Sequence, residues 1–167
     1  MKAGTIIFAA LASIALAASA RDDVHKHSMH DDADGGHPKN EGHAHAAGTP
    51  GDPKKVSRAI KLVMSDDMKF TPSNIDVKRG ETIKFVVKNA GKSRHEMIIG
   101  SMAELKEHAE MMRKMPGMEH AEPNQVTLDP GKTGALVWQF TKAGTVDFAC
   151  LQPGHFEAGM MGKVTVK

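Results

Sequence analysis

From residue 57 to the C-terminus, short segments alternate between apolar and polar residues, with turn-forming residues between them. Alternation with a period of two is the pattern of a strand that buries one of its faces. In the clearest case, Ile83, Phe85 and Val87 fall on one face of the same segment. The pattern predicts eight strands, over residues 57–64, 73–80, 82–89, 95–100, 125–132, 134–140, 145–150 and 162–167. Such a series is typical of an all-β protein, here a Greek-key β-sandwich over residues 56–167.

One segment of this region has a helical pattern instead. Ser101 followed by Glu104 is a capping box, the arrangement that begins many helices, and it precedes "MAELKEHAEMMRKM". Pro116 and Gly117 then end the helix. We therefore expect one helical, methionine-rich insertion over residues 101–118.

The N-terminus has the pattern of an export signal. Lys2 is followed by an apolar run and by small residues up to Ala20, after which the charged "RDD" begins. A membrane anchor is the alternative, but the apolar run of 16 residues is shorter than the roughly 20 that span a bilayer. We expect residues 1–20 to be a signal peptide cleaved near Ala20, no stable membrane anchor, and a periplasmic location.

Residues 21–53 have few large apolar side chains, so they cannot bury enough surface to fold, and we expect a disordered tail. The tail carries six of the chain's ten histidines, interleaved with acidic residues: His25, His27, His30, His37, His43 and His45. Imidazole and carboxylate groups suit Cu(II) or Zn(II), so the tail is predicted to bind metal weakly at several sites. A solvated linker without function is the alternative.

The net charge of the chain excludes some partners, and its single cysteine needs a separate explanation. The net charge is +2 with no Lys/Arg block, so we expect no nucleic-acid partner, and we expect a monomer. A lone cysteine cannot form an internal disulfide, and a free thiol outside the cytosol oxidises unless it is buried or bound to metal.

That cysteine lies on a Gly/Pro-rich loop, "CLQPGHFEAGMM", with an imidazole and a thioether. Cys150, His155 and Met160, completed by the distant His95, would provide a thiolate, two imidazoles and a weak axial thioether, the ligands of a type 1 copper site. The sequence leaves alternatives open: His108 or His120 as the second imidazole, and Met161 as the axial ligand. A buried core cysteine without metal, or a zinc site, would also fit the loop.

With these residues, the region 56–167 resembles the cupredoxins, the single-domain blue or green copper proteins that include azurins, plastocyanins and auracyanins. The resemblance implies copper as cofactor, with His95, Cys150, His155 and Met160 as its ligands. In the family, the loop around the C-terminal histidine docks transient redox partners, which implies a docking patch of Leu151, Pro153, Phe156 and Met161. Many members follow the first histidine with an asparagine that ties the two ligand loops together, and this chain has Glu96 there.

The helical insertion carries more sulfur and imidazole than a simple electron carrier requires. The residues are His108, Met111, Met112, Met115, Met118 and His120. Clustered thioethers suit Cu(I), so we predict accessory copper binding. The alternative is an apolar helix face on which methionines pack against the sandwich.

These segments resemble those of periplasmic cupredoxins associated with copper tolerance. We therefore expect copper tolerance or homeostasis with electron-transfer capability, and keep a dedicated electron shuttle and a Cu(I) oxidase as alternatives. An enzyme is not expected. Copper oxidases of related fold place histidines beside the site's cysteine, where this chain has Ala149 and Leu151, and a dinuclear copper centre needs two cysteines.

Overall fold

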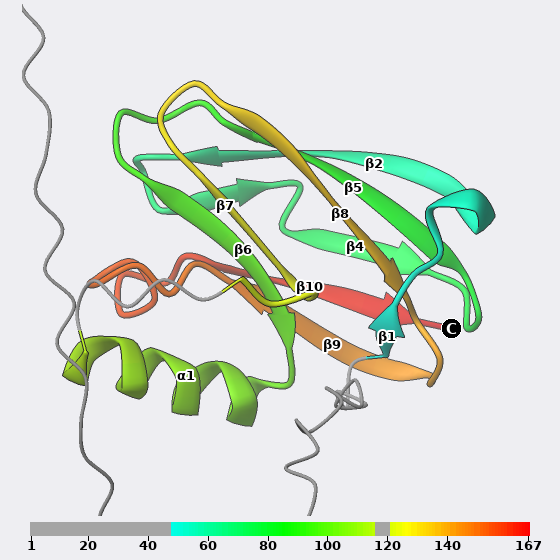
Figure 1. The fold of residues 1–167 in the computed structure, drawn as a ribbon. Coiled ribbons are helices and arrows are strands. Elements are labelled where there is room, and N and C mark those ends of the chain that lie inside the picture. Colours follow the sequence, from blue (N-terminus) through cyan, green and yellow to red (C-terminus); the bar gives the residue numbers. More distant parts are fainter. Residues whose placement is uncertain (1–47, 116–120) are drawn as a thin grey trace, which may run out of the picture. The chain divides into compact units, whose positions relative to one another are not determined.

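A computed structural model describes residues 48–115 and 121–167, which form two five-stranded sheets with one α-helix at their side (Figure 1). The first sheet has the order β1-β8-β5-β2-β3 and the second β4-β10-β9-β6-β7. The strands are β1 (Thr49–Pro50), β2 (Arg58–Ser65), β3 (Lys69–Thr71), β4 (Asn74–Val77), β5 (Thr82–Asn89), β6 (His95–Gly100), β7 (Gln125–Leu128), β8 (Thr133–Gln139), β9 (Gly144–Ala149) and β10 (Met161–Val166). The predicted β-sandwich is confirmed.

Several predictions concern residues outside the described ranges. They are the signal peptide, residues 21–47 of the tail with its six histidines, and Met118 and His120 of the insertion. Among the described residues, no helix is long and apolar enough to cross a membrane.

The chain crosses between the two sheets repeatedly, which produces two parallel strand pairs in an otherwise antiparallel sandwich. β2 runs parallel to β5, and β4 runs parallel to β10. The alternating apolar residues of both sheets meet in one core. There the ring of Phe70 lies edge-on to that of Phe148, with ring centroids 5.1 Å apart. The rings of Phe85 and Phe140 have the same arrangement, with centroids 6.3 Å apart. The core therefore follows the period-two pattern of the sequence.

Helix α1 (Met102–Lys114) begins at the predicted capping box, in which the Ser101 hydroxyl accepts a hydrogen bond from the Glu104 N–H and the Glu104 carboxylate accepts one from the Ser101 N–H. The buried Leu105 packs with Ile98 and Leu151 in a second, smaller apolar cluster. Because α1 contacts β6 and β9, all six residues of β6 are buried, although the opposite face of a strand in a sandwich is ordinarily in water.

Two strands were missed by the sequence pattern, since they are too short to show alternation. β1 lies within the predicted tail, and Thr49 and Pro50 pair with Gln139 and Trp138 of β8. The ordered chain thus begins before residue 56, with β1 and a 3-10 turn at Pro53–Lys55. β3 forms the other short edge, against β2. Prediction overestimated β4 and β7, because the chain turns at residues 78–81 and 129–132.

Candidate metal centre

Three of the predicted ligands come together at one end of the second sheet. His95 is the first residue of β6, Cys150 directly follows β9, and His155 lies in the loop between β9 and β10. β6 and β9 are antiparallel neighbours, with Ile98 opposite Ala149, so the start of one strand lies beside the end of the other. This pairing is the reason that residues 55 positions apart in sequence can meet.

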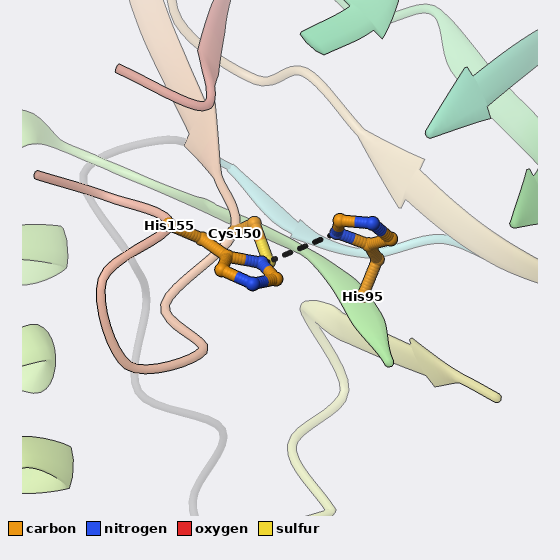
Figure 2. Close-up of side chains that lie close together, drawn as sticks. All are labelled: His95, Cys150 and His155. Carbon is orange, nitrogen blue, oxygen red and sulfur yellow. Dashed lines mark hydrogen bonds between the residues drawn. The ribbon is translucent and has the colours of Figure 1, made fainter. Parts of the chain in front are cut away.

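The three side chains converge closely enough to share one ion (Figure 2). Cys150 Sγ lies 3.2 Å from His155 Nδ1 and 4.0 Å from His95 Nδ1. The potential ligand atoms of the three residues all lie within 4.8 Å of one another, and no other such group of His, Cys, Asp or Glu occurs in residues 48–115 and 121–167. The two imidazole rings are tilted to each other, with centroids 4.7 Å apart.

The loop that carries Cys150 and His155 is shaped by its own backbone. The Cys150 N–H donates to the Met160 carbonyl at 3.1 Å, and the Met160 N–H donates to the His155 carbonyl at 3.0 Å. Gly154 and Gly159 have φ values of +84° and +89°, which other residues rarely adopt. The glycines turn the chain so that the imidazole returns to the thiol.

Burial governs the protonation of the ligands. Cys150 and His95 are fully buried, and burial raises the pKa of the Cys150 thiol to about 12. Burial, followed by repulsion from His95, lowers the pKa of His155. His155 is therefore neutral at physiological pH and has an electron pair for a metal, whereas the thiol must lose its proton when a metal binds.

The structure separates the two candidate axial methionines. Met160 is fully buried in the main core cluster that also contains Cys150. Met161 is half-buried and packs on the other cluster, with Leu105 and Leu151. Met160, and not Met161, therefore shares the core cluster of Cys150.

Glu96 joins the two ligand segments. It occupies the position that is an asparagine in many cupredoxins. Its carboxylate is 2% exposed and accepts hydrogen bonds from the Leu151 N–H at 3.0 Å, from Gln152 Nε2 at 3.0 Å and from Thr127 Oγ1 at 3.3 Å. The Glu96 N–H points to Cys150 Sγ at 3.4 Å. Glu96 therefore contacts the Cys150 segment twice, through its N–H at the thiol and through its carboxylate at the next two residues.

Asp66 is a site residue that the sequence analysis missed. It lies in the turn between β2 and β3, and its Oδ1 is 3.0 Å from His95 Nε2. No local pattern connects residues 29 positions apart, so only the folded chain reveals this contact.

The predicted docking patch needs correction at Leu151, which is buried because α1 covers it together with Ile98. Phe156 and Met161 are half-buried and pack against the same cluster, and Pro153 is exposed. A continuous apolar surface around the loop is therefore interrupted by the helix.

His108, the predicted accessory histidine on α1, is not part of the metal cluster. His108, Met111 and Met112 are half-buried on the helix, and Met115 is 42% exposed at its C-terminal end.

A thiolate, two imidazole nitrogens and a buried thioether form a donor set that suits copper in both oxidation states. A thioether is not among the usual ligands of zinc in proteins, which are thiolate, imidazole and carboxylate groups. The fold and this donor set together define a mononuclear copper protein of the cupredoxin class.

Comparison with known proteins gives the same result. Residues 58–167 match the model of the copper-binding plastocyanin/azurin family, so the chain belongs to this family. The chain is 54% identical over 129 residues to the copper-resistant cuproprotein CopI of Rubrivivax gelatinosus, covering 75% of this chain and 78% of that protein. It is 42% identical over 118 residues to the protein of the same name from Vibrio cholerae, covering 70% of each.

Solved structures with the same fold include a reduced auracyanin from Roseiflexus castenholzii, with a TM-score of 0.57, 22% identity, and coverage of 67% of this chain and 98% of that one. An azurin from Methylomonas sp. strain J has a TM-score of 0.52 and 16% identity, and the match covers 67% of this chain and 99% of that one. The expected cupredoxin fold and copper cofactor are confirmed.

Proposed function

We propose that this protein is an exported type 1 copper protein that serves copper tolerance and can transfer single electrons. The observation that carries the proposal is the convergence of His95, Cys150 and His155, with Met160 buried in the same core cluster as Cys150. The names of its relatives, copper-resistant cuproproteins, support the tolerance role. The apolar N-terminal segment supports export to the periplasm.

In this function the chain supplies a preformed set of ligands. His95 and His155 would provide ring nitrogens, Cys150 a thiolate after losing its proton, and Met160 a thioether to bound copper. Bound copper would cycle between its cuprous and cupric states and so carry one electron. The protein's contribution is to hold the ligands in a buried frame that excludes water.

Copper tolerance is favoured over a dedicated electron shuttle by the cover that α1 places over the loop. A shuttle needs an accessible apolar face for brief docking, and here Leu151 is buried under the helix while Phe156 is half-buried. We infer a weak, transient exchange of electrons or copper with a partner at the remaining surface around Pro153. The protein acts as a monomer in this scheme.

The accessory segments extend the capacity for copper beyond one ion. The thioethers of Met111, Met112, Met115 and Met118 with His108 and His120 would bind Cu(I), and the six tail histidines would bind Cu(II). We propose no enzymatic activity; Cu(I) oxidase remains the one enzymatic alternative, and oxygen consumption driven by Cu(I) would reveal it.

Copper titration with visible and paramagnetic-resonance spectra tests the proposal. We expect one strongly coloured thiolate–copper site per chain, abolished by Cys150→Ala. We also expect additional, weakly coloured Cu(II) that is lost when residues 21–47 are deleted, and additional Cu(I) that is lost when Met111, Met115 and Met118 are substituted. Deletion of the gene should reduce growth in copper, and the wild-type gene should restore it. Retention of the colour in Cys150→Ala would refute the type 1 site. A single copper per chain with unaffected growth would favour the shuttle.

A further inference from the structure

The turn between β2 and β3 places a carboxylate against a copper ligand from outside the ligand loops. Asp66 follows the last residue of β2, and its side chain is 39% exposed. The His95 ring that it contacts is fully buried. The contact is therefore at the boundary between solvent and the metal site.

Three hydrogen bonds hold this carboxylate in place. Asp66 Oδ2 accepts from the Lys92 N–H at 2.7 Å, and Oδ1 accepts from the Ser93 N–H at 3.2 Å and contacts His95 Nε2 at 3.0 Å. The loop before β6 is thus wrapped around one carboxylate, which orients it toward the imidazole.

Gly91 makes the close approach of this carboxylate possible. A Cβ added to Gly91 would lie 2.2 Å from Asp66 Oδ1 and 3.0 Å from His95 Nε2, so a side chain there would displace the carboxylate or the ring. The inner side of the same loop is fixed by Asn89, whose side-chain amide donates to the Ser93 carbonyl at 2.8 Å.

The chemistry of the pair determines which nitrogen of His95 carries the proton. An ionised carboxylate can only accept hydrogen bonds, so Nε2 must be the donor, and in the neutral ring Nδ1 then holds the free electron pair. Asp66 is partly exposed, and such a carboxylate is ionised at neutral pH. Nδ1 is the atom that lies 4.0 Å from Cys150 Sγ, on the side where the ligands converge.

We propose that Asp66 is a positioning residue of the copper site: it holds the His95 ring with its proton on Nε2 and its Nδ1 lone pair toward copper, and it favours the cupric state. A carboxylate that accepts from the far nitrogen of a metal-bound imidazole increases the donor strength of the near nitrogen. Stronger donation and a nearby negative charge both stabilise the more highly charged ion. The inference rests on the copper site of the proposed function, not on copper tolerance.

Substitution of Asp66, with Asp67 as the matched control, tests the proposal. Asp67 lies on the same turn, but it interacts with Ser65 and with Lys69 at 3.2 Å rather than with the ligand loop. We would compare wild type, Asp66→Ala, Asp66→Asn and Asp67→Asn. Asp66→Asn retains the size of the side chain but loses the charge and one acceptor, so it serves if Asp66→Ala does not fold.

The first measurement is made on copper-free protein and follows exchange of the His95 Nε2 proton with water by nitrogen-15 NMR. Hydrogen bonds to charged groups contribute about 1.5–3 kcal/mol, so exchange should be at least about tenfold faster in Asp66→Ala than in Asp67→Asn. The second measurement is the reduction potential of the copper-loaded protein, which should rise in both Asp66 variants and stay at the wild-type value in Asp67→Asn.

The outcomes are distinguishable. Equal proton exchange and equal potential in Asp66→Ala and Asp67→Asn would overturn the proposal. Faster exchange with an unchanged reduction potential would also overturn it, because Asp66 would then hold the loop and the ring in place without influencing the copper. Failure of every variant, including wild type, to bind copper would refute the proposed function, while the NMR measurement would still report on the Asp66–His95 contact.

Discussion

The backbone N–H of Leu151 donates to the Glu96 carboxylate at 3.0 Å, across 55 residues of sequence. This bond ties the loop of Cys150 to the strand of His95, and both of its partners are buried. The Leu151 N–H, Gln152 Nε2 and Thr127 Oγ1 all donate to this carboxylate, so its oxygens are hydrogen-bonded although the residue is buried.

Removal of this carboxylate should loosen the ligand loop. Glu96→Ala leaves the buried Leu151 N–H without its acceptor, which costs about 1–3 kcal/mol for one unsatisfied donor. We expect a lower free energy of unfolding in denaturant and faster amide exchange at Leu151 in copper-free protein. The control is Gln152→Ala, which removes a single, partly buried bond and should cost less; an equal or larger cost would contradict the role assigned to Glu96.

Alkaline pH should destabilise the copper-free protein through Cys150. In the unfolded chain the thiol ionises near its ordinary pKa of 9, whereas burial keeps it protonated in the folded state up to about 12. The unfolded state therefore binds fewer protons above pH 9, and stability falls by about 1.4 kcal/mol per pH unit until about pH 12.

The measurement is urea unfolding at several pH values, with Cys150→Ala as control. The chain has no tyrosine, and lysines titrate in both proteins, so the difference between the two slopes isolates the thiol. A parallel pH dependence of the two proteins would show that the thiol does not titrate as described.

Introducing a side chain at Gly91 should reproduce the loss of Asp66. The added Cβ of Gly91→Ala would meet Asp66 Oδ1 at 2.2 Å, so the carboxylate must move away from His95. We expect faster Nε2 proton exchange and a higher reduction potential, as for Asp66→Ala. Gly131→Ala is a useful comparison, because its methyl group would contact no other atom and its effect would come from backbone strain at φ +71° alone. If Gly91→Ala retained wild-type values, the close approach would be unnecessary.

Truncation of Leu105 should detach α1 without removing a copper ligand. Leu105 is 1% exposed in the cluster with Ile98 and Leu151, and comparable core truncations cost about 2–5 kcal/mol. We expect this loss in chemical unfolding, with a copper spectrum close to wild type because the ligands lie in or beside the other cluster. Lys106→Ala, on the exposed side of the helix, should be nearly neutral. Loss of the copper spectrum in Leu105→Ala would mean that the helix supports the site directly.

Much of the fold could be predicted, because a period-two pattern reports which side of a strand is buried. The capping box of Ser101 and Glu104 likewise marks the start of α1 by a local mechanism. β1 could not be found this way, since two residues show no alternation and the strand is held by backbone pairing. The period also does not say what covers the second face of a strand, so the burial of Leu151 under α1 was not anticipated.

The residues of the candidate site were likewise only partly predictable from the sequence. Cys150, His155 and Met160 lie on one loop and His95 begins a predicted strand, so residue type and spacing were sufficient to select them. The function of Asp66 depends on a turn that brings it to His95 from a different sheet, and no spacing rule encodes that contact. Residue chemistry thus identifies ligands more readily than the groups that orient them.

The loop from Cys150 to Met160 is closed at its base by the pairing of Ala149 with Met161 and by the bond between the Cys150 N–H and the Met160 carbonyl. Those interactions belong to the polypeptide alone. The closure of the loop therefore needs no metal, and the same backbone bonds would hold its base with or without bound copper.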